Sequence, residues 1–164
     1  MIQYKSYSFS LPKKSAISNQ DSILSPTEIG DYVVFAIADG VGGAANGDKA
    51  SSFITRYCSN LMKKSPDISL KALFENLWIS FVSYAKRNGY NEMASTLTFC
   101  RVGRNKLEIA HVGDCRVYVK QEKRSIKQVT QDHTAIKDIK VKYNDEIEKY
   151  YSNLITSSFS IYEK

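Results

Sequence analysis

Histidine and cysteine are scarce in this sequence of 164 residues, which contains only His111, His133, Cys58, Cys100 and Cys115. The cysteines are far apart and no two form a CxxC pair, so we expect neither a zinc site nor a disulfide framework. Two histidines are also too few for a metal site built from several imidazoles. We therefore expect Cys58 and Cys100 to behave as small buried hydrophobic side chains.

Long apolar runs are also missing from the sequence. No run approaches the ~20 residues that a membrane-spanning helix needs. The N-terminal stretch MIQYKSYSFSLPKK lacks the apolar centre and the small-residue cleavage site of a signal peptide. We therefore expect a cytoplasmic chain without a membrane partner. The length and a hydrophobic content of 43% suit a single globular domain over residues 1–164.

The net charge of +6 raises the question of a nucleic-acid partner. The basic residues are scattered, with one modest concentration from Arg101 to Lys127. That stretch lacks the interleaved aromatic residues of a base-stacking surface. A solvated face is the simplest interpretation, attraction of an anion such as a phosphorylated substrate comes second, and we expect no nucleic-acid partner.

The hydrophobic pattern predicts an α+β fold. Residues 2–11 alternate as a strand does. Residues 12–30 are typical of a loop apart from the small stretch SAISNQDSIL, and the continuous apolar run 31–39 predicts a buried strand. Apolar spacing of three and four residues predicts one helix around residues 50–62 and another over residues 70–88.

The second half of the chain begins with β-like runs. Residues 94–102, 106–112 and 115–120 are typical of strands, and glycine-containing turns separate them into an antiparallel meander. Trp78 lies on the apolar stripe of the second predicted helix, so we expect it in the core. Residues 132–164 show only weak helical periodicity.

Several short segments share one form, an acid at a strand end or turn with small or polar neighbours: Asn19-Gln20-Asp21, Asp39-Gly40, Gly113-Asp114 and Thr130-Gln131-Asp132-His133. A carboxylate at the end of a buried strand is costly unless it is paired or bound to a metal. Hard divalent cations prefer such oxygen ligands. The glycines after Asp39 could clear space for a metal, water and a phosphate. Each segment alone is more often a turn, a hairpin residue or a helix cap.

The order and spacing of these segments carry more information than any one of them. The series NQD, IADGVGG, MASTLTF, VGDCRVY and TQDHT resembles the metal-dependent protein phosphatase family, type 2C, in its bacterial form. The resemblance covers about residues 15 to 135. It implies two antiparallel sheets packed as a sandwich and flanked by helices, in the order α-β-β-α, with two Mn²⁺ or Mg²⁺ ions at one edge.

The resemblance also implies roles for individual residues. Asp39 would bridge both ions, the carbonyl of Gly40 would bind the second ion, and Asp21 would hold metal-bound water with Gln20 beside it. Asp114 would help to bind a third, weaker ion. A water on the metals would attack phosphoserine or phosphothreonine in line, so Asp39 and Asp21 are the expected catalytic residues and no nucleophilic serine or cysteine is needed.

Other positions that match the family are expected to be structural. Thr96 and Thr98 match strand positions, and His133 is interpreted as an orienting or packing residue. The implied partner is a phosphorylated protein, with a serine/threonine kinase opposing the reaction.

The sequence also departs from the family pattern. The arginine that usually grips substrate phosphate is replaced by Ala16, for which Lys13 or Lys14 could substitute as point charges. Cys115 replaces the usual serine after Gly-Asp, and we give its oxidation little weight.

The largest departure concerns the metal ligands of the family's final third. The second DG aspartate and the closing Asp-Asn aspartate have no counterpart, and LITSSF, residues 154–159, resembles the segment just before that third. We therefore expect a fragment or a shortened relative that lacks the final strands, unless other acids such as Asp145 or Glu146 replace the missing pair. The alternative to a phosphatase is a catalytically inactive phosphatase-like module that binds phosphoproteins or another partner.

Overall fold

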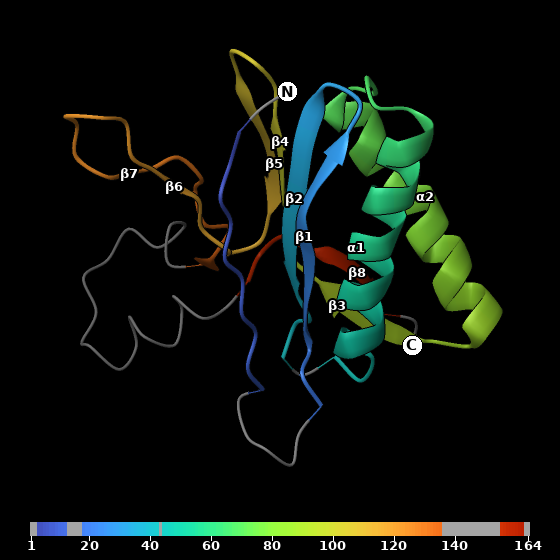
Figure 1. The fold of residues 1–164 in the computed structure, drawn as a ribbon. Helices are drawn as coiled ribbons and strands as arrows, with labels where there is room; N and C mark the ends of the chain where they lie inside the picture. Colours follow the sequence, from blue (N-terminus) through green and yellow to red (C-terminus); the bar gives the residue numbers. More distant parts are fainter. Residues whose placement is uncertain (1–2, 13–17, 43, 136–154, 163–164) are drawn as a thin grey trace, which may run out of the picture.

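The computed structural model describes residues 3–12, 18–42, 44–135 and 155–162. Its elements follow one another in the order β1 (Asp21–Ile29), β2 (Tyr32–Asp39), α1 (Gly47–Lys64), α2 (Leu70–Asn88), β3 (Glu92–Ser95), β4 (Leu97–Val102), β5 (Leu107–Val112), β6 (Tyr118–Val119), β7 (Lys127–Gln128) and β8 (Phe159–Tyr162). The predicted α+β class with antiparallel sheets is confirmed (Figure 1).

The largest sheet has four antiparallel strands in the order β1-β2-β4-β5. The β1–β2 register pairs Asp21 with Asp39, so the two acids lie opposite each other at one end of the sheet. Separate two-stranded ladders join β3 to β8 and β6 to β7. The antiparallel pairing therefore brings the first two acidic motifs of the sequence together.

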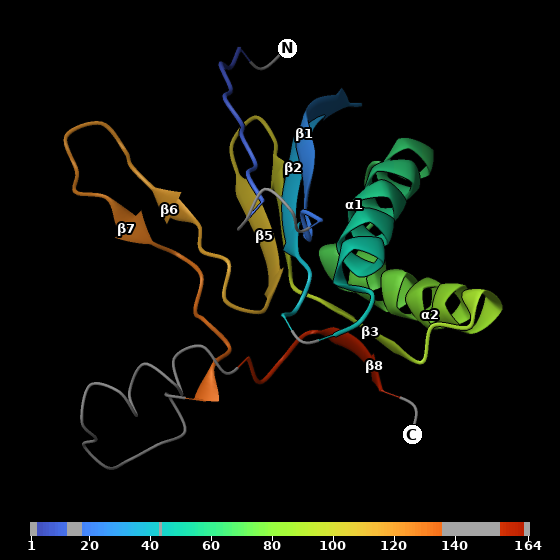
Figure 2. The ribbon, with the colours of Figure 1, turned by 90° about the horizontal axis from the view of Figure 1, so that it is seen from below.

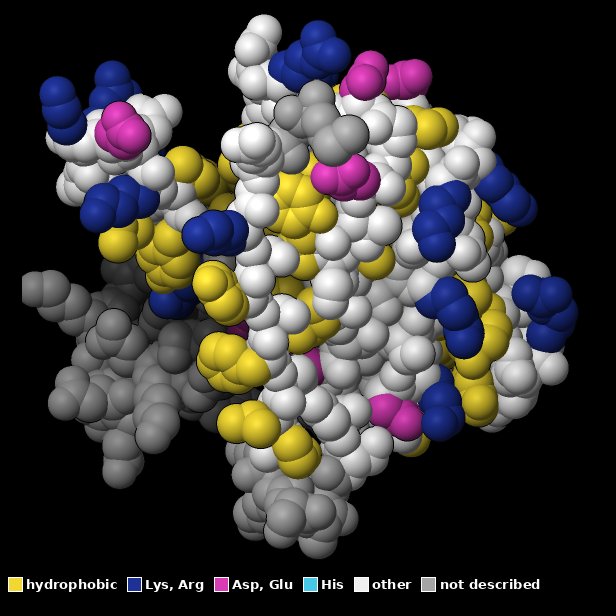
Figure 3. Space-filling view, in the orientation of Figure 1, with side chains coloured by type: hydrophobic (Ala, Val, Ile, Leu, Met, Phe, Trp, Pro, Cys, Tyr) yellow, Lys and Arg dark blue, Asp and Glu magenta, His cyan; other side chains and the backbone are white. Residues whose placement is uncertain are grey.

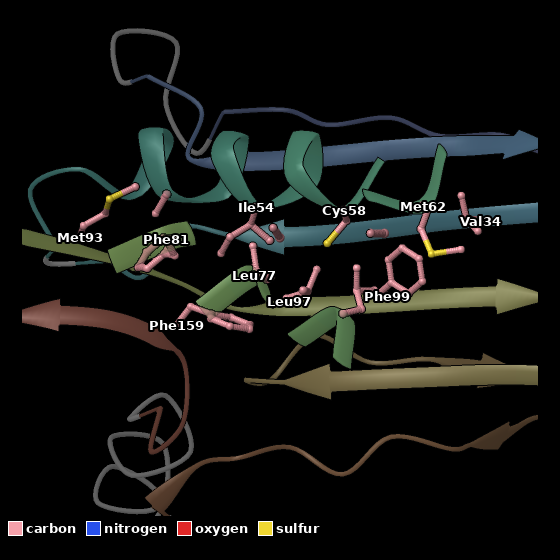
Figure 4. Close-up of a cluster of buried hydrophobic side chains, with 14 of the residues drawn as sticks. Val34, Ile54, Cys58, Met62, Leu77, Phe81, Met93, Leu97, Phe99 and Phe159 are labelled. Atoms are coloured by element: carbon pink, nitrogen blue, oxygen red, sulfur yellow. The ribbon is translucent and has the colours of Figure 1, made fainter. Parts of the chain in front are cut away.

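Both helices lie on the same face of the four-stranded sheet, as Figure 2 shows from below. The predicted spacing on α1 directs Ile54, Cys58 and Met62 toward the sheet, and all three are fully buried. Figure 4 shows them in one layer with Leu77 of α2 and Phe99 of β4. Cys58 is fully buried, which confirms its expected role as a buried hydrophobic side chain, and burial raises the pKa of its thiol to about 12.

Local signals at the two helices explain their bounds. Ser69 caps α2 by accepting a hydrogen bond from the Ala72 amide, and Gly89 ends the helix in the left-handed conformation at φ 66°. The first turn of α1 carries Asp48, where a carboxylate interacts favourably with the helix dipole. Both predicted helices are therefore confirmed. None of the helices in the described part of the chain is long and apolar enough to cross a membrane.

Some strand predictions were wrong. Residues 12–30 were expected to be mostly loop, but residues 21–29 form β1. This edge strand contains Pro26 at a break in its register between Leu24 and Thr27, and an edge strand tolerates proline at such a bulge. Residues 2–11 were expected to be a strand, but residues 3–11, which the structure describes, are exposed and belong to no strand.

Two other expectations need correction. Trp78 is 43% exposed and therefore lies at the border of the core rather than within it. Of the predicted strand 115–120, only residues 118–119 pair, in β6. Cys100, by contrast, is buried as expected, and burial raises its thiol pKa to about 11. The weak periodicity within residues 136–154 falls outside the described residues.

The face of the sheet opposite the helices is only partly covered. Residues 4–9 lie across it and, with side chains of β1 and β2, line a cavity of about 640 Å³. Ile37 is 48% exposed there, and Figure 3 shows hydrophobic side chains gathered along this face. Among the described residues, therefore, one helix layer and one larger sheet are present, and no second sheet covers the opposite face.

Candidate acidic site at the ends of strands β1 and β2

Asp39 has a backbone that is held from several directions. Its amide donates to Thr96 Oγ1 at 3.0 Å, and its carbonyl accepts from the Thr96 amide at 2.8 Å and from Ser95 Oγ at 3.0 Å. The direct partner of Asp39 on β1 is Asp21. Because β2 lies between β1 and the β3–β4 segment, the position of Asp39 is fixed on both sides.

Asp21 follows a turn that Asn19 stabilises. The Asn19 side-chain oxygen accepts from the Asp21 amide at 3.0 Å. The carbonyl of Gln20 accepts from the Gly40 amide at 3.0 Å and from Ser51 Oγ at 2.6 Å. The NQD motif is thus anchored to the end of β2 and to the first turns of α1.

Gly40 is needed for a close backbone approach. A Cβ at this position would lie 2.5 Å from the backbone of Gly47, the first residue of α1. The sequence suggested that the glycines clear space for a ligand, but this glycine makes room for the start of the helix. Gly42, which has nothing within 4 Å of its Cβ position, has no such constraint.

The turn at Gly113 and Asp114 approaches the same end of the sheet. Gly113 has a φ of +113°, and a Cβ there would lie 2.4 Å from the Thr96 methyl carbon. Thr96 therefore contacts both motifs, because its hydroxyl accepts from Asp39 and its methyl packs on Gly113. Asp114 itself is half-buried.

The electrostatics show that two other acids, Asp21 and Asp114, act on Asp39. Partial burial, the charge of Asp21, a hydrogen bond to Asp21 and the charge of Asp114 raise the pKa of Asp39 to about 6. Each of these influences favours the protonated carboxyl group, and none comes from a basic side chain. The structure therefore brings Asp21, Asp39 and Asp114 into one acidic site.

Cys115 lies beside the acidic site. Its thiol is 3.5 Å from Thr96 Oγ1, and burial together with the carboxylates of the site raises its pKa. A thiol with a raised pKa is a poor nucleophile and is oxidised slowly. The low weight given to oxidation of Cys115 agrees with this environment.

The donor chemistry of the site fits a hard divalent cation. Two carboxylates lie on paired strand ends and a third acid lies within electrostatic reach. A cation would neutralise their negative charge. The ligand number is small, because the described residues contain no group of three histidine, cysteine or acidic side chains arranged to hold a metal. Water or further ligands would have to complete a coordination shell.

The other predicted residues fall into two groups. Lys13, Lys14 and Ala16 lie outside the described residues, as do Asp145 and Glu146. The positions of Thr98 and His133 are described, and both make hydrogen bonds near the Gly113 turn.

Ser51 and Ser95 also belong to the site and were not predicted from the sequence, although their hydroxyls hold the backbone of the acidic site. Serine is common on surfaces and in turns, so no sequence signal distinguishes these two from the other serines. Their roles depend on the packing of α1 and β3 against the ends of β1 and β2.

The sequence and structure can be compared with known proteins. The sequence profile of the family described as Protein phosphatase 2C matches residues 13–154. The serine/threonine phosphatase stp of Listeria welshimeri is 28% identical over 116 residues, which cover 65% of this chain and 45% of that protein. Its counterpart from Listeria monocytogenes is 28% identical over 115 residues, with the same coverage. The chain thus spans less than half the length of these curated relatives.

Solved structures show the same fold. The crystal structure of the serine/threonine phosphatase Stp1 from Staphylococcus aureus matches with a TM-score of 0.77 at 22% identity, over 92% of this chain and 63% of that chain. The serine/threonine phosphatase PstP/Ppp of Mycobacterium tuberculosis matches with a TM-score of 0.71 at 22% identity, over 92% of this chain and 66% of that chain. The catalytic domain of PstP in complex with two manganese ions matches with a TM-score of 0.70 at 23% identity, over 92% of this chain and 64% of that chain.

Proposed function

This chain belongs to the protein phosphatase 2C family, and we propose that its acidic site serves the metal-dependent hydrolysis of phosphoserine and phosphothreonine in protein substrates. The observation that carries the proposal is the pairing of Asp21 with Asp39 at one end of the sheet, with the charge of Asp114 acting on Asp39. These acids come from separate sequence motifs and share one site, and none of the ion pairs among the described residues involves them.

Asp39 is the centre of the proposed site, since both neighbouring acids act on it. Asp39, Asp21 (through water), Asp114 and the carbonyl of Gly40 are the groups that would hold Mn²⁺ or Mg²⁺. When bound, such ions supply the Lewis acidity that makes a water nucleophilic at neutral pH. The protein's own part is to fix the backbone of these acids through hydrogen bonds. Lys13 and Lys14 remain the proposed contacts to substrate phosphate.

One observation favours a second candidate function. The described residues hold no group of three side chains suited to a metal, so the site resembles one that binds a cation weakly. The chain would then be a catalytically inactive phosphatase-like module that recognises a phosphoprotein or another partner. The two candidates differ in whether cation binding leads to release of phosphate.

The remaining features of the proposal follow from the family. We propose one phosphatase-type domain over residues 1–164, a cytoplasmic location, and a phosphoprotein substrate made by an opposing kinase. We also propose that the two-sheet sandwich, with helices on both outer faces, is the complete form of the fold. The face that carries Ile37 is then the one that a second sheet covers.

Phosphate release from a phosphothreonine peptide tests the proposal, measured with Mn²⁺ and again after addition of a chelator. Asp39→Asn removes the central carboxylate, whereas Asp31→Asn removes an exposed acid from the loop at the other end of the same β1–β2 hairpin. A phosphatase releases phosphate with Mn²⁺, loses that activity in Asp39→Asn and keeps it in Asp31→Asn.

The same experiment identifies the alternative. Mn²⁺ binding that depends on Asp39 without any release of phosphate supports the inactive binding module. Absence of Mn²⁺ binding by the unmodified chain contradicts the cation site itself.

A further inference from the structure

The turn that carries Asp114 is held by a segment distant in sequence, residues 129–133. The Val117 amide donates to Thr130 Oγ1 at 3.0 Å, and the Val129 amide donates to the Val117 carbonyl at 2.9 Å. Arg116 donates to both carboxylate oxygens of Asp132, with the shortest contact at 2.6 Å. Residues 129–133 therefore lie alongside residues 113–117 and contact them repeatedly.

His133 makes the contact nearest to Asp114. Its Nδ1 accepts a hydrogen bond from the Gly113 amide at 3.1 Å, while its own amide donates to the Gly113 carbonyl at 2.8 Å. Both backbone groups of Gly113 are thus bound to one residue. Gly113 directly precedes Asp114, so the orientation of the following peptide depends on these two bonds.

The chemistry of the first bond fixes the state of the imidazole. A backbone amide can only donate, so Nδ1 of His133 must carry a lone pair and the ring proton of the neutral form lies on Nε2. A phenylalanine ring could fill the same space but could not accept this bond. An asparagine could accept it, because its side-chain oxygen can take the place of Nδ1.

A second imidazole supports the first from its ring face. The rings of His111 and His133 are stacked with centroids 5.1 Å apart. His111 lies on β5, and its Nδ1 is 2.8 Å from Thr98 Oγ1 on β4. Burial and the neighbouring His133 lower the pKa of His111, which favours its neutral form. His111 therefore links His133 to the sheet. Its hydrogen bond to the Gly113 backbone raises its pKa, as donation to a carbonyl does. The Gly113 amide itself donates to His133, so His111 serves as a control for the bond to that amide.

We propose that His133 is a positioning residue that holds the Gly113–Asp114 turn so that Asp114 faces Asp39. Its action is through the backbone of Gly113, without contact to the phosphate or the reacting atoms. The consequence for cation binding rests on the proposed function. The consequence for the turn itself does not, since it follows from the two bonds to Gly113.

Hydrogen exchange of the Gly113 amide, measured by NMR on the ¹⁵N-labelled 164-residue chain, tests the turn directly. His133→Phe and His111→Phe each replace one ring of the same stacked pair, but only the first removes the acceptor. We expect exchange at Gly113 to become about tenfold faster in His133→Phe than in His111→Phe, as expected for loss of one buried hydrogen bond. His133→Asn should restore slow exchange.

Calorimetric titration with Mn²⁺ tests the link to the site. His133→Phe should weaken Mn²⁺ binding severalfold, as Asp114→Asn does, while His111→Phe and His133→Asn stay close to the unmodified chain. If the ring acted only by filling space, His133→Phe would keep Mn²⁺ binding and His133→Asn would weaken it. Restoration by asparagine alone is therefore the distinguishing result.

The outcomes separate this inference from the proposed function. If the unmodified chain binds no Mn²⁺, the cation site fails, and the exchange rates alone decide whether His133 holds the turn. Equal exchange at Gly113 in the two phenylalanine variants overturns the inference. It is equally overturned if Asp114→Asn weakens Mn²⁺ binding and His133→Phe does not.

Discussion

The helix-covered face of the main sheet and its acidic end belong to the same strands but are stabilised in opposite ways. On the covered face, Phe99 and Val34 lie among apolar side chains from α1 and α2 and expose nothing to solvent. At the acidic end, Asp39 faces Asp21 and lies within reach of the charge of Asp114, and its pKa rises to about 6. The covered face therefore supplies stability that the acidic end reduces, as is common where a binding site is built on a rigid scaffold.

The largest expected effect comes from the covered face. Phe99→Ala removes a fully buried aromatic ring and should lower the free energy of unfolding by about 4 kcal/mol, through lost transfer energy and a new cavity. Chemical denaturation followed by circular dichroism measures this change. Ile79→Ala, on the exposed side of α2 and 68% exposed, is the control and should change stability by less than about 0.5 kcal/mol. Similar losses in the two variants would show that the assigned core is wrong.

A smaller effect is expected where the acidic end meets β4. Gly113→Ala places a Cβ about 2.4 Å from Thr96 and forces φ of +113° on an alanine, so we expect a loss of about 2–3 kcal/mol. Gly42→Ala adds the same methyl group where nothing lies within 4 Å and should stay within about 0.5 kcal/mol. Thermal unfolding of both variants measures the two changes in stability. An unchanged stability of Gly113→Ala would contradict the close packing of this turn.

Removal of charge from the acidic end should stabilise the chain, in contrast to Phe99→Ala and Gly113→Ala. In the metal-free chain, Asp39→Asn should increase the free energy of unfolding at pH 7 by about 1 kcal/mol, a value reduced from the full shift because the carboxyl is only partly buried. The folded pKa of Asp39 is raised from 3.8 to about 6. Its protonated form therefore contributes stability that is present below about pH 4 and lost as the pH rises through about 6.

The stability difference between Asp39→Asn and the unmodified chain should therefore vanish near pH 4 and reach its full value above about pH 6. Urea unfolding across this range measures the difference. Asp31→Asn, at the opposite end of the hairpin, should show no such profile. A difference that is independent of pH would mean that Asp39 does not carry the repulsion.

The smallest effect is expected on the open face of the sheet. Ile37→Thr keeps a β-branched side chain at a site that is 48% exposed and should change the free energy of unfolding by about 0.5 kcal/mol or less. Analytical ultracentrifugation alongside unfolding would also detect reduced self-association, since an exposed apolar face favours it. A loss above about 2 kcal/mol would show that this face is buried in solution.

The sequence predicted the parts of the fold in which local pattern and tertiary packing agree. The spacing on α1 and α2, and the apolar run of β2, predicted their burial, since a regular stripe has only one way to face a core. It did not predict β1, because that strand is half-exposed and contains Pro26 at a bulge, where edge pairing overrides a weak local preference. Nor did it predict the exposure of Trp78, whose ring packs beside Phe159 at the start of β8 and stays 43% exposed.

The acidic motifs could be recognised in the sequence, but the contacts that hold them in place could be predicted only in part. The order of the acidic motifs predicted that Asp21, Asp39 and Asp114 lie together. The buried Arg101, which binds Glu108 at 2.9 Å and the carbonyls of Pro66 and Ile68, had no sequence signal beyond its charge. Hydrogen bonds between distant segments, such as that of His133 to Gly113, become visible only when the strands are paired.

The central claim is that the acids at the ends of β1 and β2 form a cation site, and the response of stability to Mn²⁺ tests it most directly. Thermal unfolding of the unmodified chain and of Asp39→Asn should be compared over a Mn²⁺ titration at pH 7. Binding to the folded chain should raise the stability of the unmodified chain by about 2.7 kcal/mol when free Mn²⁺ exceeds Kd a hundredfold, and should leave Asp39→Asn unchanged. An equal response of both chains, or no response of the unmodified chain, would contradict the account.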